Sequence, residues 1–208
     1  MRLLTAVILF FALFVSCNNK HEERTIVTKI DPASVVSKVE TSDLDQSPLD
    51  IIYFPVDYPI LKMNGNASPL PLARIIYSRP HKKGRKIFGE GNEYLCPYGV
   101  EWRLGANEAT EIEFFKNVKI NKKLLPAGRY ILYAIPYADH WKMVFNTNLY
   151  SWGLHIEKQY DIFKTDAPVT CENPKENFTI NFIDNSGNAL LTMQWDTAKA
   201  TLPLQFNF

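Results

Sequence analysis

Cysteine is scarce in this chain, and neither sign of charge is in surplus. Three of the 208 residues are Cys, and 23 Lys and Arg stand against 22 Asp and Glu, which gives a formal net charge of +1. So few cysteines exclude the dense disulfide framework of a small secreted scaffold. The chain also lacks the surplus of cations with which proteins bind a nucleic-acid backbone, so we expect no nucleic-acid partner.

The motifs of several enzyme classes are missing as well. The sequence has no phosphate-binding Gly-rich loop, no Ser nucleophile elbow and no dinucleotide-binding fingerprint. Its four histidines, which do not have the spacing of metal ligands, are His21, His81, His140 and His155. We therefore predict no metal, no cofactor and no catalytic residue that a motif identifies.

One long apolar run is present, at the N-terminus. Arg2 precedes Leu3–Val15, which only Thr5 interrupts. A membrane-spanning helix needs about 20 apolar residues, so this shorter run predicts an export signal over residues 1–16. No later run is long enough to cross a membrane.

The end of this run, Phe14-Val15-Ser16-Cys17, resembles a bacterial lipobox. The resemblance implies cleavage before Cys17, a diacylglycerol on its sulfur and a fatty acid such as palmitate on the new N-terminus. The alternative is an ordinary signal peptide followed by an incidental cysteine. We expect a protein that is lipid-anchored in the cell envelope, at the outer membrane, on its periplasmic or its surface-exposed side.

The remaining chain divides at residue 45. Residues 17–45 are mostly polar and predict a tether, and residues 46–208 predict one domain, which suits the 46% apolar content. In 46–208, apolar and polar residues alternate over short stretches, most clearly at Phe178–Phe182, Leu191–Trp195 and Ala198–Phe206. Pro203 lacks an amide donor and therefore places the last of these strands at a sheet edge.

Helical periodicity is almost absent. The three prolines of Gln46–Pro59 favour extended backbone over helix, and Leu149–Tyr160 allows at most one or two helical turns. Short strands joined by Pro- and Gly-containing turns predict an all-β fold, a single antiparallel β-sandwich of the jelly-roll kind.

A basic loop, Ser78–Phe88, is the first candidate site. Its clustered cations would suit phosphate, sulfate or carboxylate. The alternative is a solvated loop that nearby glutamates neutralise. The candidate ligand-binding residues in it are Arg79, Lys82, Lys83 and Arg85.

A second candidate site follows between Tyr98 and Glu111. An aromatic ring beside a guanidinium and a carboxamide is suited to a saccharide, with the apolar sugar face on the ring and the hydroxyls on the polar groups. The alternative is a buried network in which Arg103 pairs with Glu108, Glu111 or Glu113. The candidate ligand-binding residues are Tyr98, Trp102, Arg103, Asn107, Glu108, Thr110 and Glu111.

The carboxylates offer a further alternative, a glycosidase-like hydrolase that uses Glu108, Glu111 or Glu113. Such chemistry needs two acids about 5–9.5 Å apart, which a strand could provide. Two acids on the outer face of a strand are more often solvated. A structural or partner-binding envelope protein is the third possibility, and an exposed apolar patch would distinguish it.

Four stretches together resemble a known family. They are SRPHKKGRKIFG, PYGVEWRLGANEATEIEF, LPAGRYILYAIP and WKMVFNTNLYSWG, and they are similar in order and content to domain of unknown function family 2911. The resemblance covers roughly Gln46–Leu204. It implies an exported or lipid-anchored β domain of the kind found in Bacteroidetes-type proteins, and it brings no activity and no site residues.

The two remaining cysteines, Cys96 and Cys171, leave a disulfide and two separate thiols both open. The family pattern usually has an aliphatic residue where this chain has Cys96, which favours a buried thiol there. From the residues themselves we expect a non-enzymatic module that binds a saccharide or a small anionic ligand.

Overall fold

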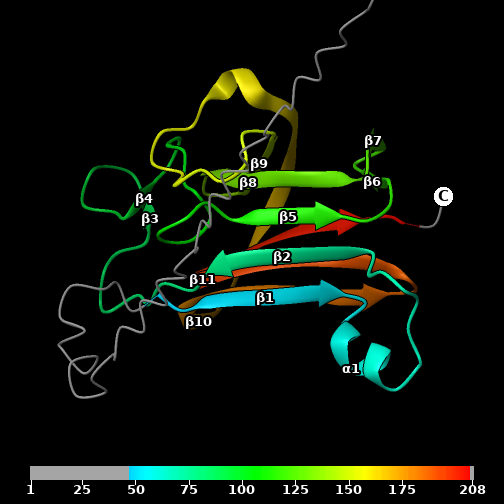
Figure 1. The fold of residues 1–208 in the computed structure, drawn as a ribbon. Helices are drawn as coiled ribbons and strands as arrows, with labels where there is room; N and C mark the ends of the chain where they lie inside the picture. The colour runs from blue at the N-terminus through cyan, green and yellow to red at the C-terminus, as the bar shows by residue number, and fades with distance from the viewer. Residues whose placement is uncertain (1–46, 207–208) are drawn as a thin grey trace, which may run out of the picture. The chain divides into compact units, whose positions relative to one another are not determined.

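The computed structural model describes residues 47–206 (Figure 1). The predicted signal peptide, the predicted lipidation site Cys17 and the tether of residues 17–45 lie outside the described residues. In the part of the chain that is described, no helix has the length and apolar character needed to cross a membrane.

The described residues are mostly β-strand, with one short α-helix, α1 (Tyr58–Met63), and one 3-10 turn, η1 (Lys158–Tyr160). Four short strands pair outside the main sheet, β3 with β4 and β6 with β7. The main sheet is antiparallel and has the order β1-β2-β5-β8-β9-β10-β11. The strands are β1 (Leu49–Phe54), β2 (Ala73–Ser78), β3 (Phe88–Gly89), β4 (Cys96–Pro97), β5 (Glu111–Phe114), β6 (Val118–Ile120), β7 (Lys123–Leu125), β8 (Gly128–Pro136), β9 (His140–Asn146), β10 (Asp161–Asn185) and β11 (Asn188–Leu204).

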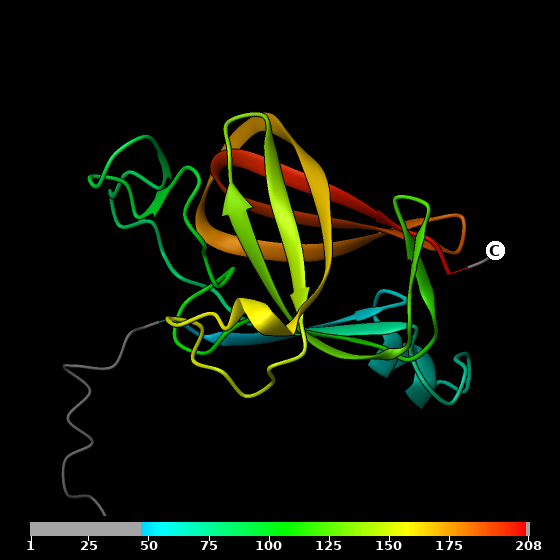
Figure 2. The same ribbon diagram turned by 90° about the horizontal axis from the view of Figure 1, so that it is seen from above.

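The main sheet curls into an antiparallel half-barrel (Figure 2). Residues Asp161–Pro168 of β10 pair with β9, and Val169–Asn185 pair with β11, with register shifts between Cys171 and Thr179. Such shifts bend a strand, and here they let one long hairpin curve over the interior. The prediction of a mostly β, antiparallel fold is confirmed. The finer prediction of a jelly-roll-like sandwich is not clearly met, because one curled sheet supplies both walls of the core.

Strand burial follows the alternation of the sequence. On β5, Ile112 and Phe114 are buried while Glu111 and Glu113 face outward. The strand β8 lies in the middle of the sheet order and is buried on both faces over much of its length. The last strand, β11, ends the sheet order, and Pro203 is exposed there. The prediction of a sheet edge at Pro203 is confirmed.

The helix α1 was not predicted, because the prolines before it argued for extended backbone. Extended backbone does occur in β1, but Pro59 stands at the start of α1. A proline is tolerated in the first turn of a helix, where its missing N–H has no helical partner to lose. The expectation of only a turn or two near Leu149–Tyr160 is met by η1.

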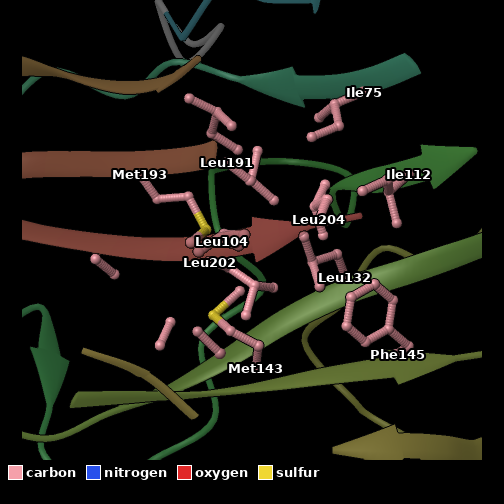
Figure 3. Packing of buried hydrophobic residues seen from close by; sticks show 14 of the residues in the cluster. Ile75, Leu104, Ile112, Leu132, Met143, Phe145, Leu191, Met193, Leu202 and Leu204 are labelled. Atoms are coloured by element: carbon pink, nitrogen blue, oxygen red, sulfur yellow. The ribbon is translucent and has the colours of Figure 1, made fainter. Parts of the chain in front are cut away.

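The core fills the interior of the half-barrel. Figure 3 shows Ile75 of β2, Ile112 of β5, Leu132 of β8, Met143 of β9 and Leu204 of β11 pointing into one shared space. Each of these side chains is fully buried. Residues distant in sequence therefore hold the opposite walls of the sheet together by burial of apolar area.

Side chains close the seam between the β1-β2 end of the sheet and the second half of β10. The Tyr77 hydroxyl accepts a hydrogen bond from the Ile180 N–H at 3.0 Å and lies 3.2 Å from the Ile180 carbonyl oxygen, to which it can donate. Nearby, the Arg79 guanidinium bonds to the Phe178 carbonyl oxygen and pairs with Asp50. The hydrogen bonds of these side chains take the place of the backbone hydrogen bonds that a neighbouring strand would make. We call this boundary the barrel seam.

Candidate functional site

A cleft of about 310 Å³ opens beside Trp102, and we call it the Trp102 cleft. It is built from the basic loop, from the chain around β4, from the loop before η1 and from β11. Two of the predicted stretches, the basic loop and the chain around Trp102, therefore meet in one place. The lining residues are Pro80, Arg85, Leu95, Cys96, Glu101, Trp102, Arg103, Gly105, Ala106, Gly153, Leu154 and Trp195.

Two tryptophans belong to the apolar lining of the cleft. The rings of Trp102 and Trp195 stack with centroids 5.9 Å apart and an interplanar angle of 24°. Trp102 also contacts Trp141 and Phe178, and its indole N–H donates to the Gly105 carbonyl oxygen. Trp102 is 8% exposed and Trp195 is 1% exposed, so both are core residues that leave little ring surface on which a sugar could stack.

Arg85 places a cation on the basic-loop side of the cleft. Its side chain is exposed, and Gly84, with φ of +72°, lets the loop turn immediately before it. The guanidinium donates to the carbonyl oxygens of Lys82 and His81 through Nε and one terminal nitrogen. The loop thus fixes the orientation of the guanidinium plane, and the second terminal nitrogen has no protein partner within residues 47–206.

Arg103 provides a second guanidinium in the lining. One terminal nitrogen donates to the Asn107 carbonyl oxygen at 2.6 Å and to the Trp152 carbonyl oxygen at 3.2 Å. The guanidinium carbon also lies 6.0 Å from the centre of the Trp152 ring, in cation–π range. Gly153 packs against this side chain, since a Cβ on Gly153 would lie 2.8 Å from the Arg103 Cβ. Arg103 therefore anchors the loop before η1.

The remaining ionisable groups of the cleft are a carboxylate and a thiol. Glu101 pairs with Lys158, and the hydrogen bond from Lys158 holds the pKa of Glu101 below its usual range. Burial strongly raises the pKa of the Cys96 thiol, so it stays protonated. Cys96 and Cys171 are both free, the first buried and the second exposed.

The other predicted residues of the basic loop lie outside the cleft lining. Arg79 is held at the barrel seam. Lys82 forms an ion pair with Asp196, with 2.7 Å between the nitrogen and the oxygen. Lys83 has an exposed side chain, and its backbone N–H donates to the carboxylate of Glu176. Of the four basic residues predicted to bind a ligand, only Arg85 lines the cleft.

Asn107 and Thr110 shape the turn after Arg103. Asn107 has φ of +58°, a left-handed conformation that asparagine tolerates, and its carbonyl oxygen receives Arg103. The buried Thr110 hydroxyl donates to the Leu104 carbonyl oxygen at 2.7 Å. Neither residue lines the cleft, and neither do the exposed Glu108 and the half-buried Tyr98.

Glu111 and Glu113 lie on the outer face of β5, away from the cleft. Arg129 on β8 is within 3.9 Å of the Glu111 carboxylate and 3.8 Å of the Glu113 carboxylate. Arg74 on β2 also pairs with Glu113. Strand pairing places Arg74 and Arg129 opposite these two glutamates, whereas Arg103 donates to the carbonyl oxygens of Asn107 and Trp152. The ion pairs of Glu111 and Glu113 therefore involve Arg74 and Arg129, where the alternative interpretation of the sequence had named Arg103.

Sequence reasoning missed most of the apolar lining. Leu95, Leu154 and Trp195 come from separate segments, and only the curl of the sheet brings them together. The sequence around Trp195 indicated only a strand, and nothing in the sequence around Leu154 indicated a binding site. Among the described residues, no group of three or more His, Cys, Asp or Glu side chains could hold a metal ion.

Comparison with known proteins gives one match. The sequence model of a family described as "Protein of unknown function (DUF2911)" matches residues 66–204. No curated protein and no solved structure matches the chain.

Proposed function

The chain belongs to the DUF2911 family, whose description states no function, and we propose that it is a non-enzymatic binding module for a small anionic ligand with an apolar body. The observation that carries this proposal is the pre-oriented Arg85 guanidinium beside an apolar lining that includes Trp102 and Trp195. A guanidinium held in place by backbone carbonyls loses little freedom when it binds a carboxylate or a phosphate.

The size and charge of the cleft support a small ligand. A volume of about 310 Å³ lies at the low end of the roughly 300–1,000 Å³ typical of ligand pockets. Arg85 and Arg103 give the lining two positive charges, and the one carboxylate, Glu101, is neutralised by Lys158. A ligand anion would therefore meet a positive potential beside apolar side chains.

The other candidate functions have less support. A saccharide would need an open aromatic face, and Trp102 is only 8% exposed. A hydrolase that uses Glu111 and Glu113 would need carboxylates in a cleft, but arginines pair with both on the outer face of the sheet. We therefore favour the anion over the saccharide and binding over hydrolysis.

Thermal-shift measurements with a matched panel test the proposal. Benzoate, phenyl phosphate, inorganic phosphate, glucuronate and glucose vary the charge and the apolar body separately. At about 100 times its dissociation constant a ligand stabilises the folded state by about 2.7 kcal/mol, which raises the melting temperature by several degrees. We expect the aromatic anions to stabilise most and glucose not at all. Stabilisation by glucose alone, or by no compound, would refute the proposal.

Two pairs of variants locate the effect. Arg85→Gln should weaken anion binding about tenfold to a hundredfold, since a charged hydrogen bond contributes about 1.5–3 kcal/mol, whereas Lys83→Gln in the same loop should not. Leu154→Glu, which puts a negative charge at an exposed position of the lining, should also weaken binding. Ile162→Glu, at an exposed position of β10 outside the lining, is its control.

We also propose that the module is anchored in the cell envelope by a lipid on Cys17. The support is the apolar run of Leu3–Val15 and the four residues that end at Cys17. Metabolic labelling with an alkyne fatty acid tests this. Label on the natural chain and none on Cys17→Ser is the expected result, and label retained by Cys17→Ser would contradict it.

A further inference from the structure

The barrel seam opens at one end into a groove of about 370 Å³, which we call the seam groove. Ile51 and Tyr53 of β1 and Ile60 of α1 line it, and Phe182 of β10 lines it from across the seam. Ile51 and Ile60 are 47% and 55% exposed, which is high for aliphatic side chains in one lining. The seam groove and the Trp102 cleft have no lining residue in common.

The backbone of β1 points hydrogen-bonding groups to the open side of its strand. The carbonyl oxygens of Pro48 and Phe54 accept hydrogen bonds from the chain of β2. Backbone groups of successive strand residues point to alternate sides, so the N–H and C=O groups of Ile51 and Tyr53 point away from β2. The Ile51 N–H donates to the Asp50 carboxylate at 2.9 Å, so the edge offers the Ile51 C=O and the N–H and C=O of Tyr53. β1 is also the first strand of the sheet order.

The backbone of β10 does the same on its side of the seam. The Ile180 N–H and C=O bond to the Tyr77 hydroxyl and not to β11. By the same alternation, the backbone groups of Phe182 and Asp184 point away from β11. In residues 47–206, no strand pairs with the outer edge of β1 or with this edge of β10 beyond Ile180.

We propose that the seam groove binds an extended segment of a partner protein as an added β-strand. Open strand edges bind extended peptides through main-chain hydrogen bonds, and pockets beside the edge select alternate side chains. Here β1 supplies the edge, and the apolar lining receives alternate aliphatic side chains of the partner. A bound segment would also cover an exposed apolar edge strand, which otherwise favours aggregation.

Charge complementarity defines the partner further. Asp57 is exposed and lies in the lining of the seam groove, and no ion pair engages it among the described residues. A Lys or Arg of the partner strand would meet this carboxylate at the end of β1. The partner segment is therefore alternately aliphatic and polar, with a cationic residue beside the aliphatic ones.

A fluorescent peptide of alternating valine and threonine with lysine at both ends is the probe, and the full chain is the protein. Fluorescence anisotropy should show saturable binding. N-methylation of alternate amides should weaken it at least about tenfold, because each methyl removes a donor to the strand edge. Ile60→Ser should weaken binding about tenfold, while Met63→Ser, an exposed change on the same helix outside the lining, should not. Asp57→Asn should weaken binding at low salt and not at high salt.

Three results would overturn the proposal. One is equal binding of the natural and N-methylated peptides, or of the Ile60→Ser variant and the natural chain. Another is dimerisation in light scattering that Ile60→Ser abolishes, which would make a second copy the occupant. The third is slow hydrogen exchange of the Tyr53 and Phe182 amides without peptide, which would mean that residues before Ser47 already fill the groove.

Discussion

Removal of the Tyr77 hydroxyl tests how the barrel seam is held. Tyr77→Phe keeps the ring, which packs edge-on against Phe178 at 5.8 Å, and deletes only the oxygen. That oxygen accepts from the Ile180 N–H, lies in donor range of the Ile180 C=O and also lies 3.3 Å from the Asp50 carboxylate. The Ile180 N–H and C=O would lose this partner at a buried position.

The expected cost follows from those two groups. A buried donor or acceptor left without a partner costs about 1–3 kcal/mol, so two adjacent groups give about 2–4 kcal/mol once water entry at the seam is allowed for. Urea unfolding followed by tryptophan fluorescence measures this difference. The control is Tyr53→Phe, because the Tyr53 ring is half-buried on β1 and its hydroxyl has no partner among the described residues.

Alkaline pH gives a second readout of the same hydroxyl. Burial raises the pKa of Tyr77 to about 12, from an ordinary value near 10. The unfolded chain therefore loses this proton first, so the free energy of unfolding is unaffected below about pH 10 and decreases between pH 10 and 12. In Tyr77→Phe this decrease should be smaller than in the natural chain. Equal stability of Tyr77→Phe and Tyr53→Phe at pH 7 would refute the account of the seam.

Two further predictions concern the loop before η1 and the thiols. Gly153→Ala should lower the free energy of unfolding by about 1–3 kcal/mol, because the new Cβ meets that of Arg103 at a φ of +78°. Gly65→Ala is the control, because Gly65 has a φ of +72° and open space around it, so only the cost of the left-handed backbone applies. Equal losses of stability in the two variants would contradict the packing of Gly153 against Arg103. Of the two described thiols, Cys171 should react with a thiol reagent in the native protein, whereas Cys96 should react only after denaturation. Rapid reaction of Cys96 in the native protein, or no reaction of Cys96 after denaturation, would contradict a free, buried thiol.

Local sequence patterns predicted the strands well, because burial alternates where one face of a strand is covered. β5 and β11 follow this rule, with Ile112 in and Glu111 out, and with Pro203 at the sheet edge. The curl of the sheet was not predictable. It depends on register shifts in β10 between Cys171 and Thr179. Pro174 lies in this stretch and is typical of an irregular strand position, but it does not indicate which strands pair on either side of the bend.

The candidate site was predictable only where its residues lie close together in the sequence. Arg85, Trp102 and Arg103 stood out because charged and aromatic residues cluster in the sequence, and all three line the cleft. The roles of their neighbours could not be read from the sequence, since Thr110 and Asn107 serve backbone groups of the turn. Trp195 and Leu154 come to the cleft only through the long hairpin and the loop before η1.

The most direct test of the anion-binding account is a nitrogen-15 NMR titration of the full chain with the strongest stabilising anion. The chain has four tryptophans, and each gives one indole N–H signal. The account predicts saturable shifts that are largest for Trp102 and Trp195 and that Arg85→Gln abolishes at the same ligand concentration. Saturable shifts elsewhere with these two signals unmoved, or shifts that survive Arg85→Gln, would contradict it.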